Sequence, residues 1–171
     1  SQDGAQGLPA PLIGDKGLSP AQKMVLKSAY GLPLSDEELP IFKLTTGLQE
    51  YIPREWAEMT LILGRRAGKS DKLASNIALY EACVREHRAS KGEVPVVMVC
   101  ASELERQARV VFKYLEAKID GSAVLRRMVK RRTAYEIELR SGVLIQIFPA
   151  SQARIRGASL ACFLGDECAW W

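Results

Sequence analysis

The segment LILGRRAGKSD constrains this chain more than any other stretch of its sequence. An apolar run ends in a glycine, and Gly68-Lys69-Ser70 then completes the end of the phosphate-binding loop pattern G-x-x-x-x-G-K-[ST]. Three residues separate Gly64 from Gly68, one fewer than the pattern has, so Leu63 occupies the position of the first glycine. The segment predicts a phosphate-binding loop that lacks its first glycine.

The flanks of this segment are those that a phosphate-binding loop requires. Residues 59–64, MTLILG, are predicted as a short apolar strand, and a helix is predicted after the loop. Loop amides and the positive end of the helix dipole together favour an anion at such a junction. Lys69 is expected to reach the β- and γ-phosphates of a nucleotide, and the Ser70 hydroxyl to bind Mg²⁺. A glycine-rich turn that carries Lys-Ser by chance is the alternative.

The apolar face predicted for the helix after the loop consists of Leu73, Ile77, Tyr80 and Val84.

A second motif, LACFLGDE, joins an apolar strand to two adjacent carboxylates, Asp166 and Glu167. At the carboxyl edge of a sheet, Asp166 is expected to order the Mg²⁺ ion that Ser70 binds. Glu167 is expected to orient and deprotonate the attacking water, as a general base does. A kinase needs no such glutamate beside its metal aspartate, so the pair favours hydrolysis. An acidic turn after a core strand is the alternative.

The order of the predicted elements indicates an α/β fold. Residues 1–17 are rich in glycine and proline and are predicted as a flexible leader before a domain of residues 18–171. Ser19-Pro20 is predicted to open one helix and Ser35 to cap a second.

After the phosphate-binding loop, predicted strands and helices alternate along the chain. VPVVMVC is predicted as a strand buried on both faces, and Ser102 is predicted to cap the helix ELERQARVVFKYLEAKI. TAYEIELR and VLIQIFPA are predicted to form an antiparallel hairpin that turns at Gly142. We therefore expect a mainly parallel central sheet flanked by helices, with one antiparallel hairpin.

Composition and charge exclude several classes of protein. Four cysteines without a C-x-x-C pair, and a single histidine, leave no zinc ligand set and predict reduced thiols. The apolar runs are far shorter than the roughly 20 residues that span a bilayer, and no signal peptide is visible, so no membrane partner is expected. A net charge of +4 permits a polyanionic partner without requiring one.

Arginines form a third set of candidate residues. Arg65 and Arg66 lie within the loop, where a guanidinium would neutralise γ-phosphate charge from the same subunit. Arg154 and Arg156 precede the last predicted strand and are candidates to reach into a neighbouring subunit's site. A solvated loop arginine is the alternative for each of them.

Two weaker signals lie outside the loop. Gln22, at the start of the first predicted helix, is a candidate to hydrogen-bond the edge of adenine, and an ordinary surface glutamine is the alternative. A run of five basic residues would either neutralise DNA phosphates or form a solvated connector. These residues are Arg126, Arg127, Lys130, Arg131 and Arg132.

In the order of these motifs, the chain resembles the ATPase domain of large terminase subunits, the DNA-packaging motors of tailed bacteriophages. The resemblance rests on LILGRRAGKS, the Gln-Ala of ASELERQARVVF, the hairpin at Gly142, Arg156-Gly157 and GDECAWW. It runs from about Leu18 to the end of the chain. Phosphate-binding loops of this family commonly lack the first glycine and carry an arginine where Arg65 stands.

The resemblance implies an ASCE-type, RecA-like P-loop NTPase fold that uses ATP and Mg²⁺. It implies a homo-oligomeric ring that is docked on a portal protein and works with a small terminase subunit. This ring would pump double-stranded DNA into a procapsid in the cytoplasm of the bacterial host. The catalytic residues carried over by position are Glu167, Lys69, Arg65 and Arg156, and the metal ligands are Ser70 and Asp166. The nucleotide-binding residues are Gly64, Arg65, Arg66, Ala67, Gly68, Lys69, Ser70 and Gln22.

Two other functions are compatible with the same motifs. A helicase-like, DNA-dependent ATPase shares the sheet and the Asp-Glu pair, and a P-loop domain that acts as an assembly switch would bind nucleotide with little turnover. The chain begins with Ser1 and stops at Trp171, where the terminase family continues with a coupling motif and a nuclease domain. We therefore expect a fragment that hydrolyses ATP weakly by itself and does not cut DNA.

Overall fold

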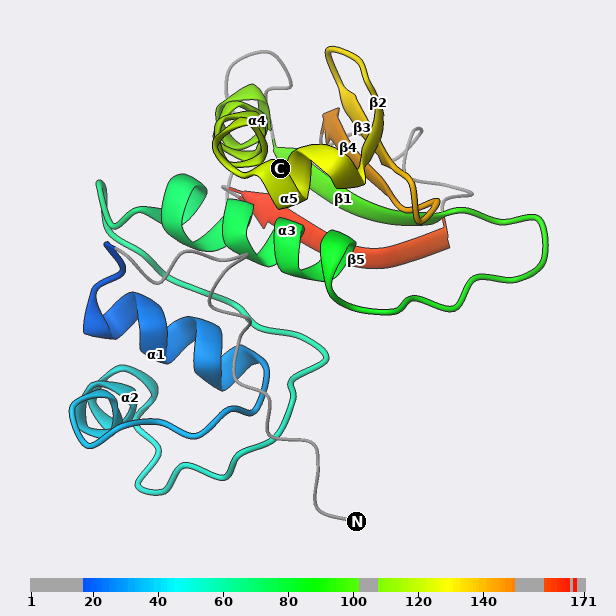
Figure 1. The fold of residues 1–171 in the computed structure, drawn as a ribbon. Helices are drawn as coiled ribbons and strands as arrows, with labels where there is room; N and C mark the ends of the chain where they lie inside the picture. The colour runs from blue at the N-terminus through cyan, green and yellow to red at the C-terminus, as the bar shows by residue number, and fades with distance from the viewer. Residues whose placement is uncertain (1–16, 102–107, 150–158, 167, 169–171) are drawn as a thin grey trace. The chain divides into compact units, whose positions relative to one another are not determined.

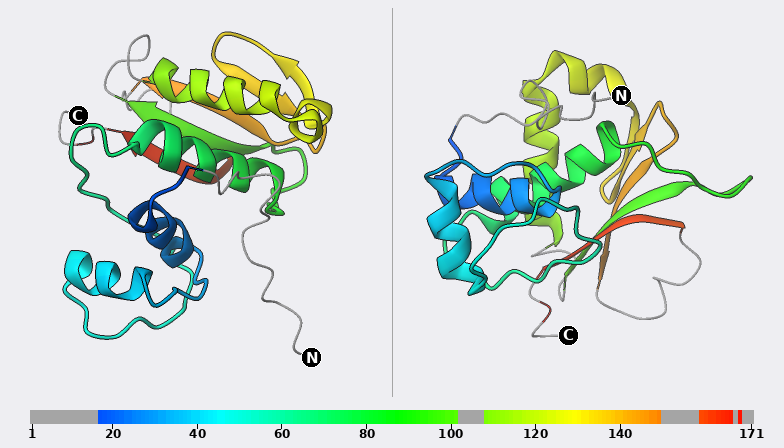
Figure 2. Two further views of the ribbon diagram at one scale, coloured as in Figure 1. Left: turned by 60° about the vertical axis from the view of Figure 1, so that its left-hand side comes forward. Right: turned by 90° about the horizontal axis from the view of Figure 1, so that it is seen from below.

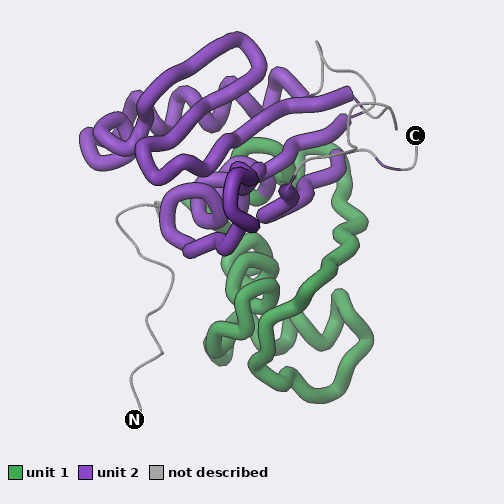
Figure 3. The backbone as a smooth tube through the Cα atoms, turned by 90° about the vertical axis from the view of Figure 1, so that its right-hand side faces the viewer, with its two compact units in different colours: residues 1–73 green, residues 74–171 purple. Residues whose placement is uncertain are grey.

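The computed structural model describes residues 17–101, 108–149, 159–166 and 168 (Figure 1). Residues 1–16 of the predicted leader and the predicted Ser102 cap therefore lie outside the described residues. The chain divides into two compact units, residues 1–73 and residues 74–171 (Figure 3). The loop predicted to bind phosphate belongs to the first unit, and the strand that carries Asp166 belongs to the second.

The first unit begins with α1 (Pro20–Ala29), whose start is the one that the sequence predicts. The Ser19 side chain accepts a hydrogen bond from the Gln22 amide at 3.3 Å, and the Gln22 side chain accepts one from the Ser19 amide at 2.9 Å. This reciprocal capping box satisfies two of the amide groups that the start of any helix leaves without a carbonyl. Pro20 fits the first turn, where no amide is needed.

The second helix, α2 (Glu38–Thr46), starts later than the prediction of a Ser35 cap implies. The Ser35 side chain does not cap the helix. Instead its carbonyl accepts hydrogen bonds from the Glu38 and Leu39 amides, each at 3.0 Å, and its own amide donates to the Glu38 carboxylate at 2.9 Å. Glu38 therefore takes over the role of organising the turn before α2. Glu38 is buried, whereas Ser35 is exposed.

Glu38 also joins the two helices, because its carboxylate accepts a hydrogen bond from the Lys27 ammonium at 2.8 Å. Burial alone would raise the pKa of Glu38, but the hydrogen bonds from Lys27 and Ser35 and the Lys27 charge outweigh it and hold the pKa below its ordinary value. The ionised carboxylate therefore favours the folded state. This stabilisation is present above the unfolded-state pKa and is lost as the pH falls through the lowered folded-state pKa.

We expect Glu38→Gln to lower the free energy of unfolding by about 1–3 kcal/mol at neutral pH, because it leaves the Lys27 ammonium without its carboxylate. The difference from the wild type should shrink as the pH falls through the lowered pKa, because the wild-type carboxyl group then becomes protonated too. Urea unfolding at a series of pH values measures this. Glu37→Gln, at the exposed neighbouring position, is the matched control and should show little change at any pH. A Glu38→Gln effect independent of pH would contradict the expectation.

The strand predicted over residues 59–64 is absent, and this prediction was wrong. These residues belong to no helix or strand, and Ile62 is 98% exposed. A β-strand exists only where its amides and carbonyls pair with those of a neighbouring strand. Apolar and β-branched residues favour the strand conformation, but they do not supply a strand to pair with. Residues 59–64 therefore lead into the loop without the backbone hydrogen bonds of a sheet.

The second unit is built on a sheet of five strands in the order β2-β3-β4-β1-β5 (Figure 1). The strands are β1 (Pro95–Ala101), β2 (Val129–Arg132), β3 (Glu136–Leu139), β4 (Leu144–Pro149) and β5 (Ser159–Asp166). β1 pairs parallel with β4 and β5, and β3 pairs antiparallel with β2 and β4. The unit is α/β as predicted, but its sheet is mixed rather than mainly parallel.

Several strand predictions are confirmed. β1 is buried along nearly its whole length, as its unbroken apolar sequence predicts, and β3 and β4 form the predicted antiparallel hairpin. β2 was not predicted, because its sequence VKRR is short and three of its four residues are charged. A short edge strand with basic side chains is a common way to keep other chains from adding to a sheet.

Three helices accompany the sheet, namely α3 (Ser75–Cys83), α4 (Arg109–Gly121) and α5 (Ala123–Met128). α3 and α4 lie side by side on one face of the sheet (Figure 2). The predicted inner face of the helix after the loop was partly wrong, because only Leu73 of its four residues is buried. Small side chains at several buried positions of α3 let its backbone approach the sheet. The buried residues of α3 are Ser75, Asn76, Ala78, Leu79, Glu81 and Ala82.

α3 and α4 are also joined through a polar contact. The Lys118 ammonium donates hydrogen bonds to the Ser75 hydroxyl and to the side-chain carbonyl of Asn76, each at 2.7 Å. Ser75 and Asn76 are buried, so these bonds satisfy groups that would otherwise destabilise the fold. In the described part of the chain, no helix is long and apolar enough to span a membrane.

Candidate nucleotide-binding site

The loop from Gly64 to Gly68 has a defined backbone conformation. The Ala67 amide donates to the Gly64 carbonyl at 3.3 Å, which closes a tight turn. Two residues of the loop have a left-handed backbone, Arg66 with φ of 62° and Gly68 with φ of 77°. Turns that mix right- and left-handed residues orient successive amide groups into a concavity that suits an anion. The loop thus combines a tight turn with two left-handed residues.

A helix begins directly after the loop, as the sequence predicts. Its first part is a π-helix, η1 (Lys69–Ala74), which continues as α3. The Gly68 carbonyl accepts hydrogen bonds from both the Lys72 amide at 2.7 Å and the Leu73 amide at 3.3 Å. A π-type turn is rare, is usually a single turn within an α-helix, and is frequent at functional sites. It places Lys69 and Ser70 in the first turn, at the positive end of the helix dipole.

Gln22 is in contact with the loop through its side-chain amide. Its Nε2 group donates to the Ala67 carbonyl at 2.9 Å, and its Oε1 atom accepts the Ser19 amide of the capping box. Both ends of the amide are therefore engaged, and one N–H of the Nε2 group and one lone pair of the Oε1 atom remain for a further partner. The sequence does not predict this positioning role. Its only local signal is the S-x-x-Q spacing of the capping box, which fixes the side chain over the first turn of α1.

A side chain at Gly68 would force neighbouring side chains to shift. A Cβ atom there would lie 2.8 Å from the Gln22 Nε2 atom and 2.9 Å from the Lys72 Cγ atom, both closer than such atoms normally approach. Its left-handed backbone also disfavours any residue with a Cβ atom. The glycine is therefore required by both conformation and space.

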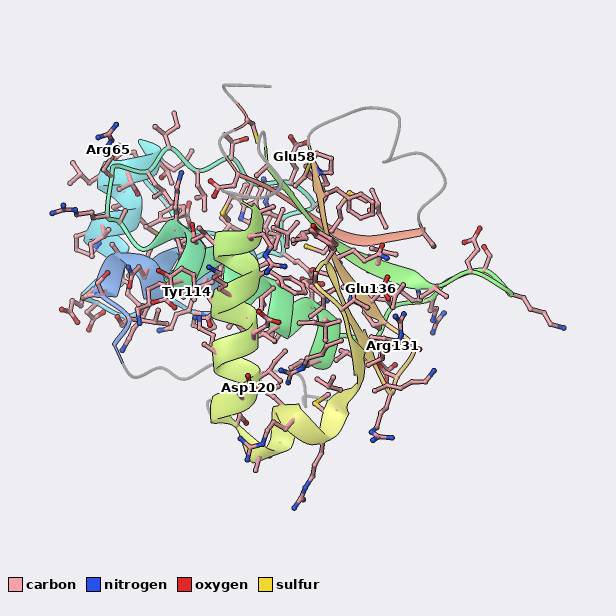
Figure 4. All side chains as sticks on the ribbon, turned by 90° about the horizontal axis from the view of Figure 1, so that it is seen from above. Glu58, Arg65, Tyr114, Asp120, Arg131 and Glu136 are labelled. Atoms are coloured by element: carbon pink, nitrogen blue, oxygen red, sulfur yellow. The ribbon has the colours of Figure 1, made fainter. Side chains whose placement is uncertain are left out.

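The two loop arginines are exposed. Figure 4 labels Arg65, whose side chain points outward from the loop. Arg66 is in the left-handed region, which costs a non-glycine residue roughly 1–2 kcal/mol. Backbone strain of this kind persists where surrounding structure fixes it, and it is concentrated at functional sites. The tight turn from Gly64 and the Gln22 bond to Ala67 are the contacts that hold this loop.

In the second unit, Asp166 is the last residue of β5, as predicted. It pairs in register with Ala101 of β1, which in turn pairs with Pro149 of β4. All three parallel strands therefore end at the same edge of the sheet, and Asp166 lies at that edge. The edge beyond the carboxyl ends of parallel strands is where α/β proteins bind ligands. Glu167, Arg154 and Arg156 lie outside the described residues.

Three of the four cysteines are in surroundings that raise the pKa of the thiol. Burial raises the pKa of Cys83 to about 11, and burial together with the Glu81 charge raises that of Cys162 to about 12. Burial, with the neighbouring Cys168, raises the pKa of Cys100. These three thiols stay protonated at neutral pH and are poor nucleophiles and poor metal ligands. Within the described residues, no three His, Cys, Asp or Glu side chains are grouped so as to hold a metal ion.

A scan against protein-family models, a search of curated proteins and a search of solved structures each found no match to this chain.

Proposed function

We propose that this chain is a P-loop NTPase that binds ATP with Mg²⁺ and hydrolyses it. The observation that carries the proposal is the loop at Gly64–Gly68, because it combines the sequence G-K-S, two left-handed residues and a helix that begins at Lys69. Each of these features favours a bound phosphate for a separate physical reason: the ammonium charge, the oriented amides and the helix dipole. A glycine-rich turn that carried Lys69-Ser70 only by chance would not require a left-handed backbone at Arg66 or close packing around Gly68.

The donor atoms also suit magnesium. The Ser70 hydroxyl and the Asp166 carboxylate are hard oxygen ligands, and Mg²⁺ is usually held by one or two protein carboxylates together with phosphate oxygens and water. When bound, Mg²⁺ would neutralise charge on the phosphates. Lys69 would hold the phosphates, and Glu167 would orient the attacking water and accept its proton. Arg65 in the same subunit and Arg156 from a neighbour are proposed to stabilise the charge that develops.

We propose further that this ATPase belongs to the large terminase subunit of a tailed bacteriophage. In this proposal a ring of subunits, docked on a portal protein in the host cytoplasm with a small terminase subunit, uses hydrolysis to move double-stranded DNA into a procapsid. The order of the motifs along the sequence supports this proposal, and the five-stranded α/β sheet with Asp166 at its carboxyl edge is compatible with it.

The metal provides the direct test. We expect this chain to bind a fluorescent ATP analogue more tightly with Mg²⁺ than with EDTA, and the assembled protein to hydrolyse ATP. Asp166→Asn should raise the Mg²⁺ concentration needed for half-maximal turnover at least about 10-fold, because it removes the charged metal ligand. The matched control is Asp36→Asn, at an exposed position before α2, which should leave this concentration unchanged. An Asp166→Asn protein with the wild-type Mg²⁺ dependence would refute the metal role.

A further inference from the structure

Six basic residues of the second unit lie on α5, on β2 and at the position after β3. We call this set the α5–β2 basic surface. The strands bring it together, because Val129 of β2 pairs with Leu139 of β3, and the Arg140 amide donates to the Met128 carbonyl at 2.8 Å. Its members are Arg126, Arg127, Lys130, Arg131, Arg132 and Arg140.

Half of this surface is neutralised by carboxylates of the same unit. Glu138 accepts from the Lys130 ammonium at 2.6 Å and from the Arg131 Nε atom at 3.2 Å, and Glu136 pairs with the other end of the Arg131 guanidinium. Figure 4 shows Arg131 and Glu136 on these neighbouring strands.

The third carboxylate belongs to α4. Asp120, which Figure 4 labels at the end of that helix, pairs with Arg132 at 2.7 Å. Six cations and three carboxylates leave a formal charge of +3, which is most of the net charge of +4 carried by the whole chain. The mild basicity of this protein is therefore concentrated in one place.

The other three arginines carry charge that no carboxylate of the described residues pairs with. Arg126 donates to the Asp120 carbonyl, and the Arg140 Nε atom donates to the Arg127 carbonyl at 3.0 Å. A backbone carbonyl orients a guanidinium but does not neutralise it, and most of the five N–H donors of each arginine remain available. All three arginines are exposed. Arg126, Arg127 and Arg140 thus form a group of exposed guanidinium ions, which is the chemistry that binds phosphate.

We propose that the α5–β2 basic surface binds the phosphate backbone of double-stranded DNA. Backbone phosphates are contacted by arginine and lysine without regard to base sequence, as a protein that moves along DNA requires. The choice of DNA as the polyanion rests on the proposed function. The binding itself needs no nucleotide, so it is measured without ATP and can succeed or fail independently of ATP hydrolysis.

The test is the salt dependence of binding to a short fluorescent duplex, measured by anisotropy from about 50 to about 200 mM salt, where phosphate contacts are most sensitive. Changing Arg126, Arg127 and Arg140 together to glutamine should reduce the slope of log affinity against log salt by about 2.7, because each lost phosphate contact removes roughly 0.9. Affinity at low salt should fall at least about 10-fold. The matched control changes three exposed basic residues elsewhere in the same unit to glutamine, namely Arg88, Lys91 and Lys113.

A single variant protects the test against misfolding. The Arg127 side chain makes no hydrogen bond to a described residue, so Arg127→Gln removes charge without removing an internal contact, and its slope should fall by about 0.9. Equal losses in the triple variant and its matched control would overturn the proposal, since net charge alone would then account for binding. An unchanged slope in the Arg127→Gln protein would also overturn it. Binding to phosphatidylserine vesicles but not to the duplex would overturn it in favour of an anionic membrane surface.

Discussion

Lys69→Ala should lower ATP turnover at least about 100-fold in the assembled protein. A donor that binds charge developing on the reacting group contributes roughly 100- to 1,000-fold when it is removed from a preorganised site. Lys69 stands at the first position of η1, where the helix dipole and the loop amides already favour anionic phosphates, and its ammonium adds a full charge there. ATP binding should also weaken, because in the proposed site the lysine would contact the phosphates in the ground state as well.

Two further variants distinguish a loss of the chemical step from a loss of nucleotide binding. Glu167→Gln should bind ATP as well as the wild type while turnover falls, because a general base acts only in the chemical step. Lys43→Ala, at an exposed position of α2, is the matched control and should retain wild-type turnover. Wild-type turnover no higher than that of Lys69→Ala and Glu167→Gln would refute ATP-driven translocation and favour the assembly switch.

Gly68→Ala should weaken binding of ATP at least about 10-fold, or by more than roughly 1.4 kcal/mol. The new Cβ atom would meet Gln22 and Lys72 at under 3 Å, so the side chain that holds the Ala67 carbonyl must move, and the loop amides move with it. The left-handed backbone at Gly68 adds a cost of about 1–2 kcal/mol to the folded state. Binding of a fluorescent ATP analogue and urea unfolding measure the two effects separately.

Gly47→Ala supplies the matched control for this prediction. Gly47 has a nearly identical left-handed backbone, with φ of 73°, but a Cβ atom there would have no heavy atom within 4 Å. Both variants should therefore lose stability through backbone strain, and only Gly68→Ala should lose affinity for ATP. Equal nucleotide affinity in the two variants would mean that the contact between Gln22 and the loop does not shape the phosphate site.

The contact between Gln22 and Ala67 joins two features that the sequence presents separately. The capping box fixes Gln22 at the start of α1, and the same side chain then holds the loop 45 residues later. Gln22, a candidate adenine contact in the sequence, thus also holds the loop through the Ala67 carbonyl. Local spacing identifies the capping box, but no local pattern shows where the free end of the side chain will donate its hydrogen bond.

The sequence by itself determined the parts of this protein that depend on neighbouring residues. Ser19 and Pro20 define the start of α1, the G-K-S motif opens η1, and the apolar run before Asp166 forms a strand that ends at that residue. These predictions succeed because capping, helix initiation and strand preference are set by side chains a few positions apart.

Only the tertiary structure decided which apolar segments pair and which backbones are strained. Residues 59–64 have the composition of a strand but no ladder, while the charged segment of β2 pairs with β3, because pairing depends on a partner outside the segment itself. In the same way, the left-handed Arg66 and the crowded Gly68 follow from the turn at Gly64 and from Gln22. Propensity is a property of a segment, whereas pairing, burial and strain are properties of the contacts that the whole chain makes.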